Sequence, residues 1–256
     1  VELAESSYGV NLDLFTSALD ASLYGFHGYH SWPGIAFDAF TMDTINLQAL
    51  ALDLYEKAYR INMAGADISI PLGSWIIRAE GSWMTPNESR GTKEYLPFPE
   101  FSYAGEMELA LSWFTLIAGY HGKYILDYIV PEAEASLSSG PGQFAPLLEA
   151  GIPISSPLVN EAVKAQIDAF NRLYNYHLEE YYHTAFLVMK GNFLHDLLEF
   201  ELPLVYHITT GEWIIQPSLS WMASDGIKLK AGYHGFFGPS ESLFDMIGPT
   251  LNAGYL

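Results

Sequence analysis

The chain has 256 residues, enough for one large β domain, and its 30 acidic and 11 basic residues give a formal net charge of −19. This charge repels the nucleic-acid backbone and excludes nucleic acid as a partner. The absence of cysteine excludes a disulfide framework and a thiolate site. Hydrophobic residues make up 50% of the chain, yet no apolar run approaches the ~18 residues of a membrane-crossing helix.

Alternation of apolar and polar residues predicts β-strands along most of the chain. In the N-terminal half, strands are expected at 8–14, 22–29, 60–70, 75–83, 102–113 and 116–123. The segment 30–59 is predicted as a loop, marked by Trp32-Pro33-Gly34. Within it, residues 50–55 are either a further strand or a short ordered piece.

The C-terminal half begins with a long insertion, 128–182, whose first part is loop-like. Ser156-Pro157 is typical of a helix N-terminus, and the apolar spacing that follows predicts an amphipathic helix at about 158–176. If the strands close into a barrel, this helix has three candidate positions: inside the lumen of the barrel, over the mouth of the lumen, or packed on neighbouring loops. Strands are then expected at 184–190, 198–206, 213–222, 227–237 and 250–256, with a hairpin at Asp225-Gly226 and a loop at 238–249.

The connections alternate in length. Tight turns are expected near 16–20, 71–74, 112–115 and 223–226, short connections at 190–196 and 207–212, and long ones at 30–59, 85–99, 128–182 and 238–249. Outer-membrane barrels have short periplasmic turns and longer extracellular loops. The sequence therefore predicts one all-β domain, 1–256. We expect a transmembrane antiparallel up-and-down β-barrel with about 11–12 strands and one helical insertion in a long extracellular loop.

The first strand of this arrangement runs toward the periplasm, whereas single-chain bacterial barrels are even-numbered and normally start there. We therefore expect further strands upstream of Val1. Because the chain begins at Val1 without a leader-like segment, we expect either a removed signal peptide or a fragment of a larger barrel.

Several segments carry a family resemblance: YGVNLDL with DASLYGFHGYHSWPG, GADISIPLGSWIIRAEGSW, YAGEMELAL with LIAGYHGKYILDY, and IIQPSLSWMASDGIKLKAGYHGFFG. Together they resemble a poorly characterised family of porin-like Gram-negative outer-membrane barrels. The resemblance implies location in the cell outer membrane, contact with the lipid bilayer and lipopolysaccharide, and passive diffusion of small solutes or cations. It leaves a second copy of the chain or another envelope protein as a candidate partner. Such barrels usually end on an aromatic residue, whereas here Tyr255 is penultimate and Leu256 is last.

If the apolar strand faces meet lipid, the opposite faces line a lumen. The charged residues expected there are Asp13, Asp67, Arg78, Glu80, Glu106, Glu108, Lys123, Glu199, Glu201, Lys228 and Lys230. Acids outnumber bases in this set, which favours cations in a pore. An alternative stays open, in which Arg78 pairs with Glu80 and Lys228 and Lys230 pair with Glu199 and Glu201. The charges would then only fill the lumen.

The sequence indicates no covalent chemistry. Glu106 and Glu108 stand ~7 Å apart on one strand face, a separation compatible with paired catalytic carboxylates, but an alternating polar face produces such pairs by default. None of the eight histidines has a metal-ligand spacing, and no GxSxG motif occurs. We therefore expect no enzyme, no cofactor and no metal, with Ca²⁺ in an acidic loop as the best metal candidate.

Two further function classes stay open beside the channel. One is a structural barrel that sheathes or anchors a partner, such as an electron-transfer or secretion component. The other is a soluble, aromatic-rich β-sandwich that binds carbohydrate. Its aromatic residues would face a groove, whereas those of a membrane barrel form two girdles.

Overall fold

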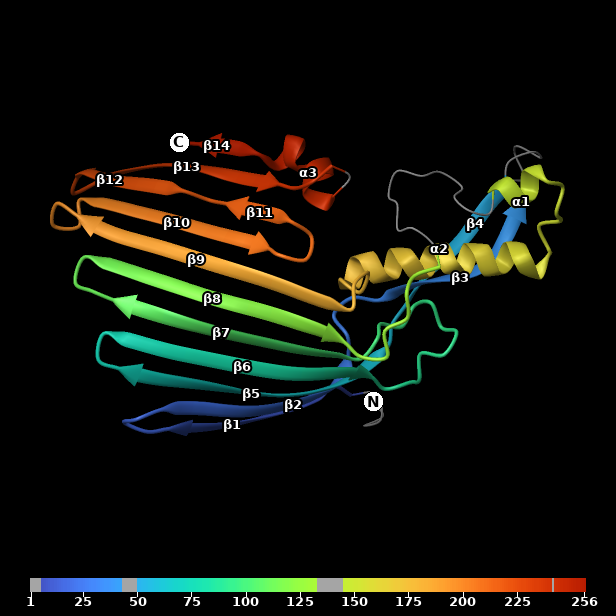
Figure 1. Cartoon of the computed structure of the whole chain (residues 1–256), viewed down its shortest axis with the longest axis horizontal. Coiled ribbons are helices and arrows are strands. Elements are labelled where there is room, and N and C mark those ends of the chain that lie inside the picture. Colours follow the sequence, from blue (N-terminus) through green and yellow to red (C-terminus); the bar gives the residue numbers. More distant parts are fainter. Residues whose placement is uncertain (1–5, 43–49, 133–144, 241) are drawn as a thin grey trace.

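The computed structural model describes residues 6–42, 50–132, 145–240 and 242–256, and most of them form antiparallel β-structure (Figure 1). The main sheet has 12 strands. Its strands, in chain order, are β1 (Tyr8–Phe15), β2 (Asp20–Tyr29), β5 (Arg60–Leu72), β6 (Trp75–Pro86), β7 (Glu100–Ala110), β8 (Phe114–Ile125), β9 (Tyr181–Phe193), β10 (Leu198–His207), β11 (Glu212–Ile215), β12 (Ser218–Ser224), β13 (Ile227–Phe237) and β14 (Ala253–Tyr255).

The strands of the main sheet follow one another in chain order, with β11 and β12 sharing one position between β10 and β13, so the sheet is a meander. The tight turns 16–19, 73–74, 111–113, 194–197 and 225–226 all lie at one end, which we call the turn end (Figure 1). The described parts of the connections 30–59, 87–99, 126–180, 208–211 and 238–252 lie at the other, the loop end. The predicted sorting of long and tight connections to opposite ends is therefore confirmed.

One strand expected at 213–222 is divided. β11 and β12 both pair with β10 and β13, but Gln216 and Pro217 interrupt them. Proline has no N–H to donate to the ladder, which explains the break. The chain stays aligned because the Gln216 N–H donates to the Pro203 carbonyl at 3.0 Å and the Tyr233 N–H donates to the Pro217 carbonyl at 2.9 Å.

The loop end carries a folded unit of its own. β3 (Gly34–Met42) and β4 (Leu50–Lys57) form a separate two-stranded sheet, so the segment predicted as a loop is a hairpin outside the main sheet. The predicted helix is confirmed as α2 (Pro157–Asn175). A second helix, α1 (Ala145–Glu149), corrects the expectation of a single helical insertion. We call β3, β4, α1, α2 and the segment 87–99 the loop-end unit; its hairpin and helices project beyond the strand ends (Figure 1).

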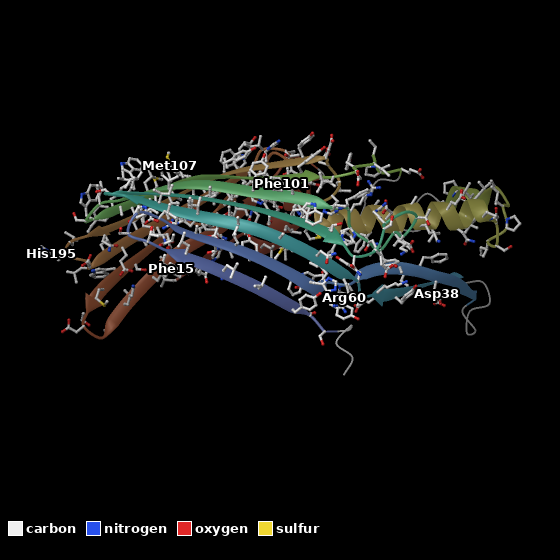
Figure 2. All side chains as sticks on the ribbon, turned by 90° about the horizontal axis from the view of Figure 1, so that it is seen from below. Phe15, Asp38, Arg60, Phe101, Met107 and His195 are labelled. Atoms are coloured by element: carbon white, nitrogen blue, oxygen red, sulfur yellow. The ribbon has the colours of Figure 1, made fainter. Side chains whose placement is uncertain are left out.

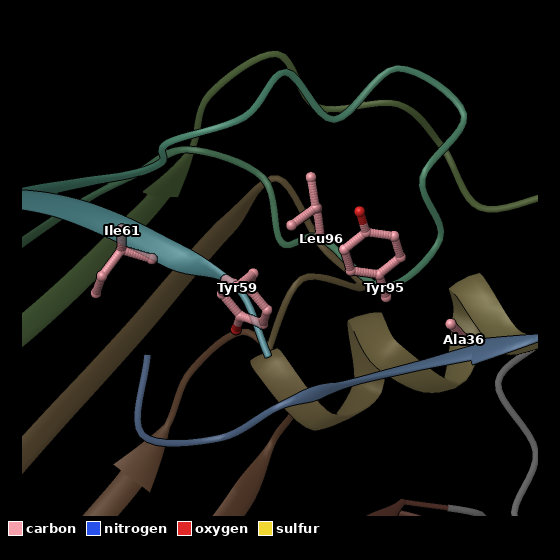
Figure 3. Packing of buried hydrophobic residues seen from close by; sticks show 5 residues of the cluster. All are labelled: Ala36, Tyr59, Ile61, Tyr95 and Leu96. Atoms are coloured by element: carbon pink, nitrogen blue, oxygen red, sulfur yellow. The ribbon is translucent and has the colours of Figure 1, made fainter. Parts of the chain in front are cut away.

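The buried apolar residues gather at this end. One cluster joins the start of β5 to the loop-end unit through Ala36, Tyr59, Ile61, Tyr95 and Leu96 (Figure 3). A second cluster packs three residues of α2, Val159, Val163 and Ile167, against β3 and α1. The long middle of the sheet contributes little to either cluster, so its two faces remain uncovered.

The predicted loop 238–249 is wrong in its second half. α3 (Leu243–Leu251) forms there, and the Ser242 hydroxyl caps it by accepting the Asp245 N–H at 3.2 Å. The final strand is shorter than expected, because β14 covers only Ala253–Tyr255.

The main sheet bends into an arch (Figure 2). Among the described residues, β1 pairs only with β2 and β14 only with β13, so the sheet is open between these two edges. β1 and β14 both run from the loop end to the turn end.

Candidate functional site

The strand register divides the charged from the apolar residues. Partners directly opposite each other in a ladder share a face. One such row joins Asp13, Ser22, Asp67, Glu80, Ala104, His121, Thr184, His207 and Glu212 across nine strands, and the next begins at Phe15 and includes Asp20, Ser69, Arg78, Glu106 and Phe186. Counting alternate residues from these rows places all eleven residues predicted to line a lumen on this one face. We call it the inner face.

The opposite, outer face carries one formally charged residue among the described positions of the main sheet, Arg60 at the loop-end start of β5. The outer face is also exposed: Met107 on β7 is 50% accessible, and Leu12, Leu219 and Leu229 are similarly open. Figure 2 shows Phe101 and Met107 on the convex side of the arch. An exposed apolar surface of this extent on a single chain is typical of a face that contacts lipid or another protein.

Aromatic residues of the outer face form two belts. The turn-end belt contains Trp75, Trp113, Phe193 and Trp221, and the loop-end belt contains Trp83, Phe101, Tyr103, Tyr120, Tyr124, Tyr181, Tyr206 and Trp213. Aliphatic residues such as Ile77 and Leu187 lie between them. Trp75 and Trp83 are separated by eight residues, or about 26 Å along the strand, and by about 20 Å along an axis tilted by about 40°.

The inner face carries a network of ion pairs. Arg78 contacts Glu106 at 2.5 Å and Glu108 at 2.8 Å, so the two carboxylates considered as a catalytic pair are bound to one guanidinium. The pairing predicted between Arg78 and Glu80 is therefore wrong. The ladder decides this outcome, because Glu106 is directly opposite Arg78 on the neighbouring strand.

The other charges of the inner face pair in part as expected. Lys228 contacts Glu199 at 2.5 Å, as the sequence suggested. Glu201, however, contacts Lys190 at 3.0 Å, a base that sequence reasoning did not consider. Lys230 takes part in no ion pair among the described residues, so part of the predicted pairing does not form.

Several carboxylates of the inner face, among them Asp13, Asp67 and Glu80, form no ion pair with a base in the described part of the chain. Asp67 and Glu80 are directly opposite each other on β5 and β6. They border a hollow of about 450 Å³ whose other polar lining includes Arg78, Glu106 and His121. Opposed like charges destabilise a strand pair, so this arrangement favours a cation or a cationic solute in the hollow.

At the junction between sheet and loop-end unit, Glu100, Lys123 and His177 form a buried group. Lys123 contacts Glu100 at 2.8 Å, and the His177 Nε2 lies 2.8 Å from the same carboxylate oxygen. The Phe98 N–H donates to His177 Nδ1. His177 is therefore neutral with its proton on Nε2, which donates to Glu100. Burial lowers the pKa of His177 below its ordinary value, in agreement with the neutral form.

Further polar contacts fix α2 in place. Asn171, 4% exposed, accepts the Ile35 N–H and donates to the carbonyls of Ile35 and Glu94. Asp168 pairs with Arg90 and Arg172, and both guanidinium groups lie over the Phe98 ring. α2 thus packs on the neighbouring loops, the third of the three places considered for it.

Sequence reasoning missed the contribution of α3. Phe244 of this helix packs edge-on against Phe236 and His207, both of which belong to the inner face. The signal that predicts the helix is Ser242 three residues before Asp245, but Pro249 favours a loop.

Among the described residues, no group of three or more histidine, aspartate or glutamate side chains is placed to hold a metal ion. No helix in the same part of the chain has the length and hydropathy to cross a membrane. No protein-family model matches the sequence, and no curated protein matches it.

Proposed function

We propose that this chain is the wall of a β-barrel in a Gram-negative outer membrane and that it works as a passive, cation-preferring channel. The observation that carries the proposal is the division of the sheet into two faces: an apolar, exposed outer face with two aromatic belts, whose one charged residue, Arg60, lies at the loop end, and an inner face that holds the other charged residues of the described main sheet. An outward apolar band ~25 Å tall between aromatic girdles is typical of outer-membrane barrels. The long connections then lie outside the cell and the tight turns face the periplasm.

A carbohydrate-binding sandwich is favoured less. A sandwich buries one face of each sheet against a second sheet, whereas both faces of the main sheet are open here. Its aromatic residues would gather in a groove, but those of the outer face are divided between the two ends of the strands.

Closure of the arch is part of the proposal. Because β1 and β14 run in the same direction, pairing them directly would give a parallel seam. An antiparallel seam requires either an odd number of additional strands or pairing of β1 with the edge of β13, where β14 covers only Gly232, Tyr233 and His234. Either solution places the inner face around a lumen.

The inner-face charges set the expected selectivity. Of the eleven predicted lumen residues, seven are acidic (Asp13, Asp67, Glu80, Glu106, Glu108, Glu199, Glu201) and four are basic (Arg78, Lys123, Lys228, Lys230). Carboxylate-rich pores favour cations. Asp67 and Glu80 contribute together because they are directly opposite each other and no ion pair joins either to a base among the described residues.

Planar-bilayer recording of the detergent-purified chain under a KCl gradient tests the proposal. We expect steady ohmic steps with a cation-selective reversal potential. The double variant Asp67→Asn/Glu80→Gln lowers the cation preference, and the matched variant Lys230→Gln raises it. Membrane insertion without any current would refute the open channel and would favour a lumen that a partner occupies.

A further inference from the structure

α3 does not continue the wall of the sheet. It lies at the loop end of β13, between the last two strands (Figure 1). Its Phe244 is 6% exposed and contacts the rings of Phe236 and His207 at centroid distances of 5.5 and 5.8 Å. Both rings belong to the inner face, so the helix lies on the side of the sheet that carries the charges.

Polar contacts hold the helix against this face. The carboxylate of Glu212, 5% exposed, accepts the Phe244 N–H at 2.9 Å near the helix N-terminus. At the other end, the Asn252 side chain accepts the Phe236 N–H at 2.7 Å. A Cβ at Gly248 would come within 2.6 Å of the Phe236 carbonyl oxygen, so glycine allows the close approach. The helix is thus fixed at both ends and in the middle.

We infer that α3 narrows the loop-end mouth of the channel and sets the size of the solute that enters. This inference rests on the proposed channel function. A helix with its side chains is about 10 Å in diameter, which is close to two strand spacings of ~4.8 Å. A helix of that width on the inner wall removes a large part of a small lumen. α2 does not have this role, because it packs on β3 beyond the strand ends.

Cysteine labelling in this cysteine-free chain gives a direct test. Thr250→Cys places a thiol on an exposed position of α3, and Leu158→Cys places the matched control on an exposed position of α2. After labelling with a bulky charged thiol reagent, confirmed by mass spectrometry, we expect Thr250→Cys to show a lower unitary conductance. Leu158→Cys should keep that of the unlabelled protein.

A second variant tests the same role without labelling. Replacing residues 243–251 by a Gly-Ser segment of equal length removes the helix and should shift the conductance and the largest accepted solute upward. Unchanged conductance in both α3 experiments, with a conducting wild type, would refute the role of α3 and leave the channel function standing. No current from either the wild type or the replacement variant would refute the channel, and the inference with it.

Discussion

The outer face offers the sharpest test of the membrane assignment, because one substitution has different consequences in lipid and in water. Met107 lies between the two aromatic belts, six residues from Phe101 and four from Leu111, and is 50% exposed. If this face meets lipid, Met107→Arg brings a charge to the middle of the apolar band. The expected loss is roughly 2–4 kcal/mol of unfolding free energy, or roughly a 30- to 800-fold change in the folding equilibrium.

Equilibrium urea unfolding in lipid vesicles measures this loss. Leu111→Arg, at the turn end of the same face, should cost only about 0–1 kcal/mol. Ala104→Lys, on the inner face opposite Glu80, should stay within about 0.5 kcal/mol of the wild type. In a soluble protein, an exposed Met107→Arg would also stay within about 0.5 kcal/mol. Equal, small effects at all three positions would therefore refute the assignment of the outer face to lipid.

Three further predictions concern the inner face and the loop-end unit. Arg78→Gln leaves Glu106 and Glu108 without their counter-charge, so the reversal potential should become more cation-selective; a shift toward anions would contradict this reasoning. Asn171→Leu leaves buried backbone groups unpaired at about 1–3 kcal/mol, so limited proteolysis should cut the loop-end unit faster while the sheet stays protected. Burial lowers the pKa of His177, so its neutral form stabilises the unit above the ordinary pKa of about 6.5, and this stability is lost as the pH falls below that value. Hydrogen exchange in α2 should rise with acidification, and His177→Gln should flatten this dependence.

The strands and the division of their faces were predictable because each face is chemically uniform. On β7, Phe101, Met107 and Leu109 alternate with Ser102, Glu106 and Glu108, and on β6, Trp75, Ile77 and Trp83 alternate with Arg78, Glu80 and Ser82. The helix α2 was predictable because Pro157 fixes its start and its apolar spacing is continuous. In these segments the local pattern and the tertiary environment agree.

The remaining features depend on contacts between residues that are distant in the chain. The partner of Arg78 is set by the register of β6 on β7, which brings Glu106 opposite to it in place of Glu80 on its own strand. The position of α3 depends on contacts with Glu212 and Phe236, which lie outside its own sequence. Pro249 within the helix makes the local sequence resemble a loop. The proposed closure of the sheet, and with it the proposed lumen, depends on strand edges that no local pattern specifies.

The meander order makes the wall modular. With β11 and β12 counted as one interrupted strand, each strand pairs with its neighbours in chain order, and two strands joined by a tight turn form a unit with one largely apolar and one charged face. Removal or duplication of such a unit, cut within the connections of the loop end, preserves strand direction and the alternation of faces on both sides of the cut. Evolved variants of this sequence can therefore change the number of strands in the sheet in steps of two, while the remaining strands keep their alternating sequence pattern.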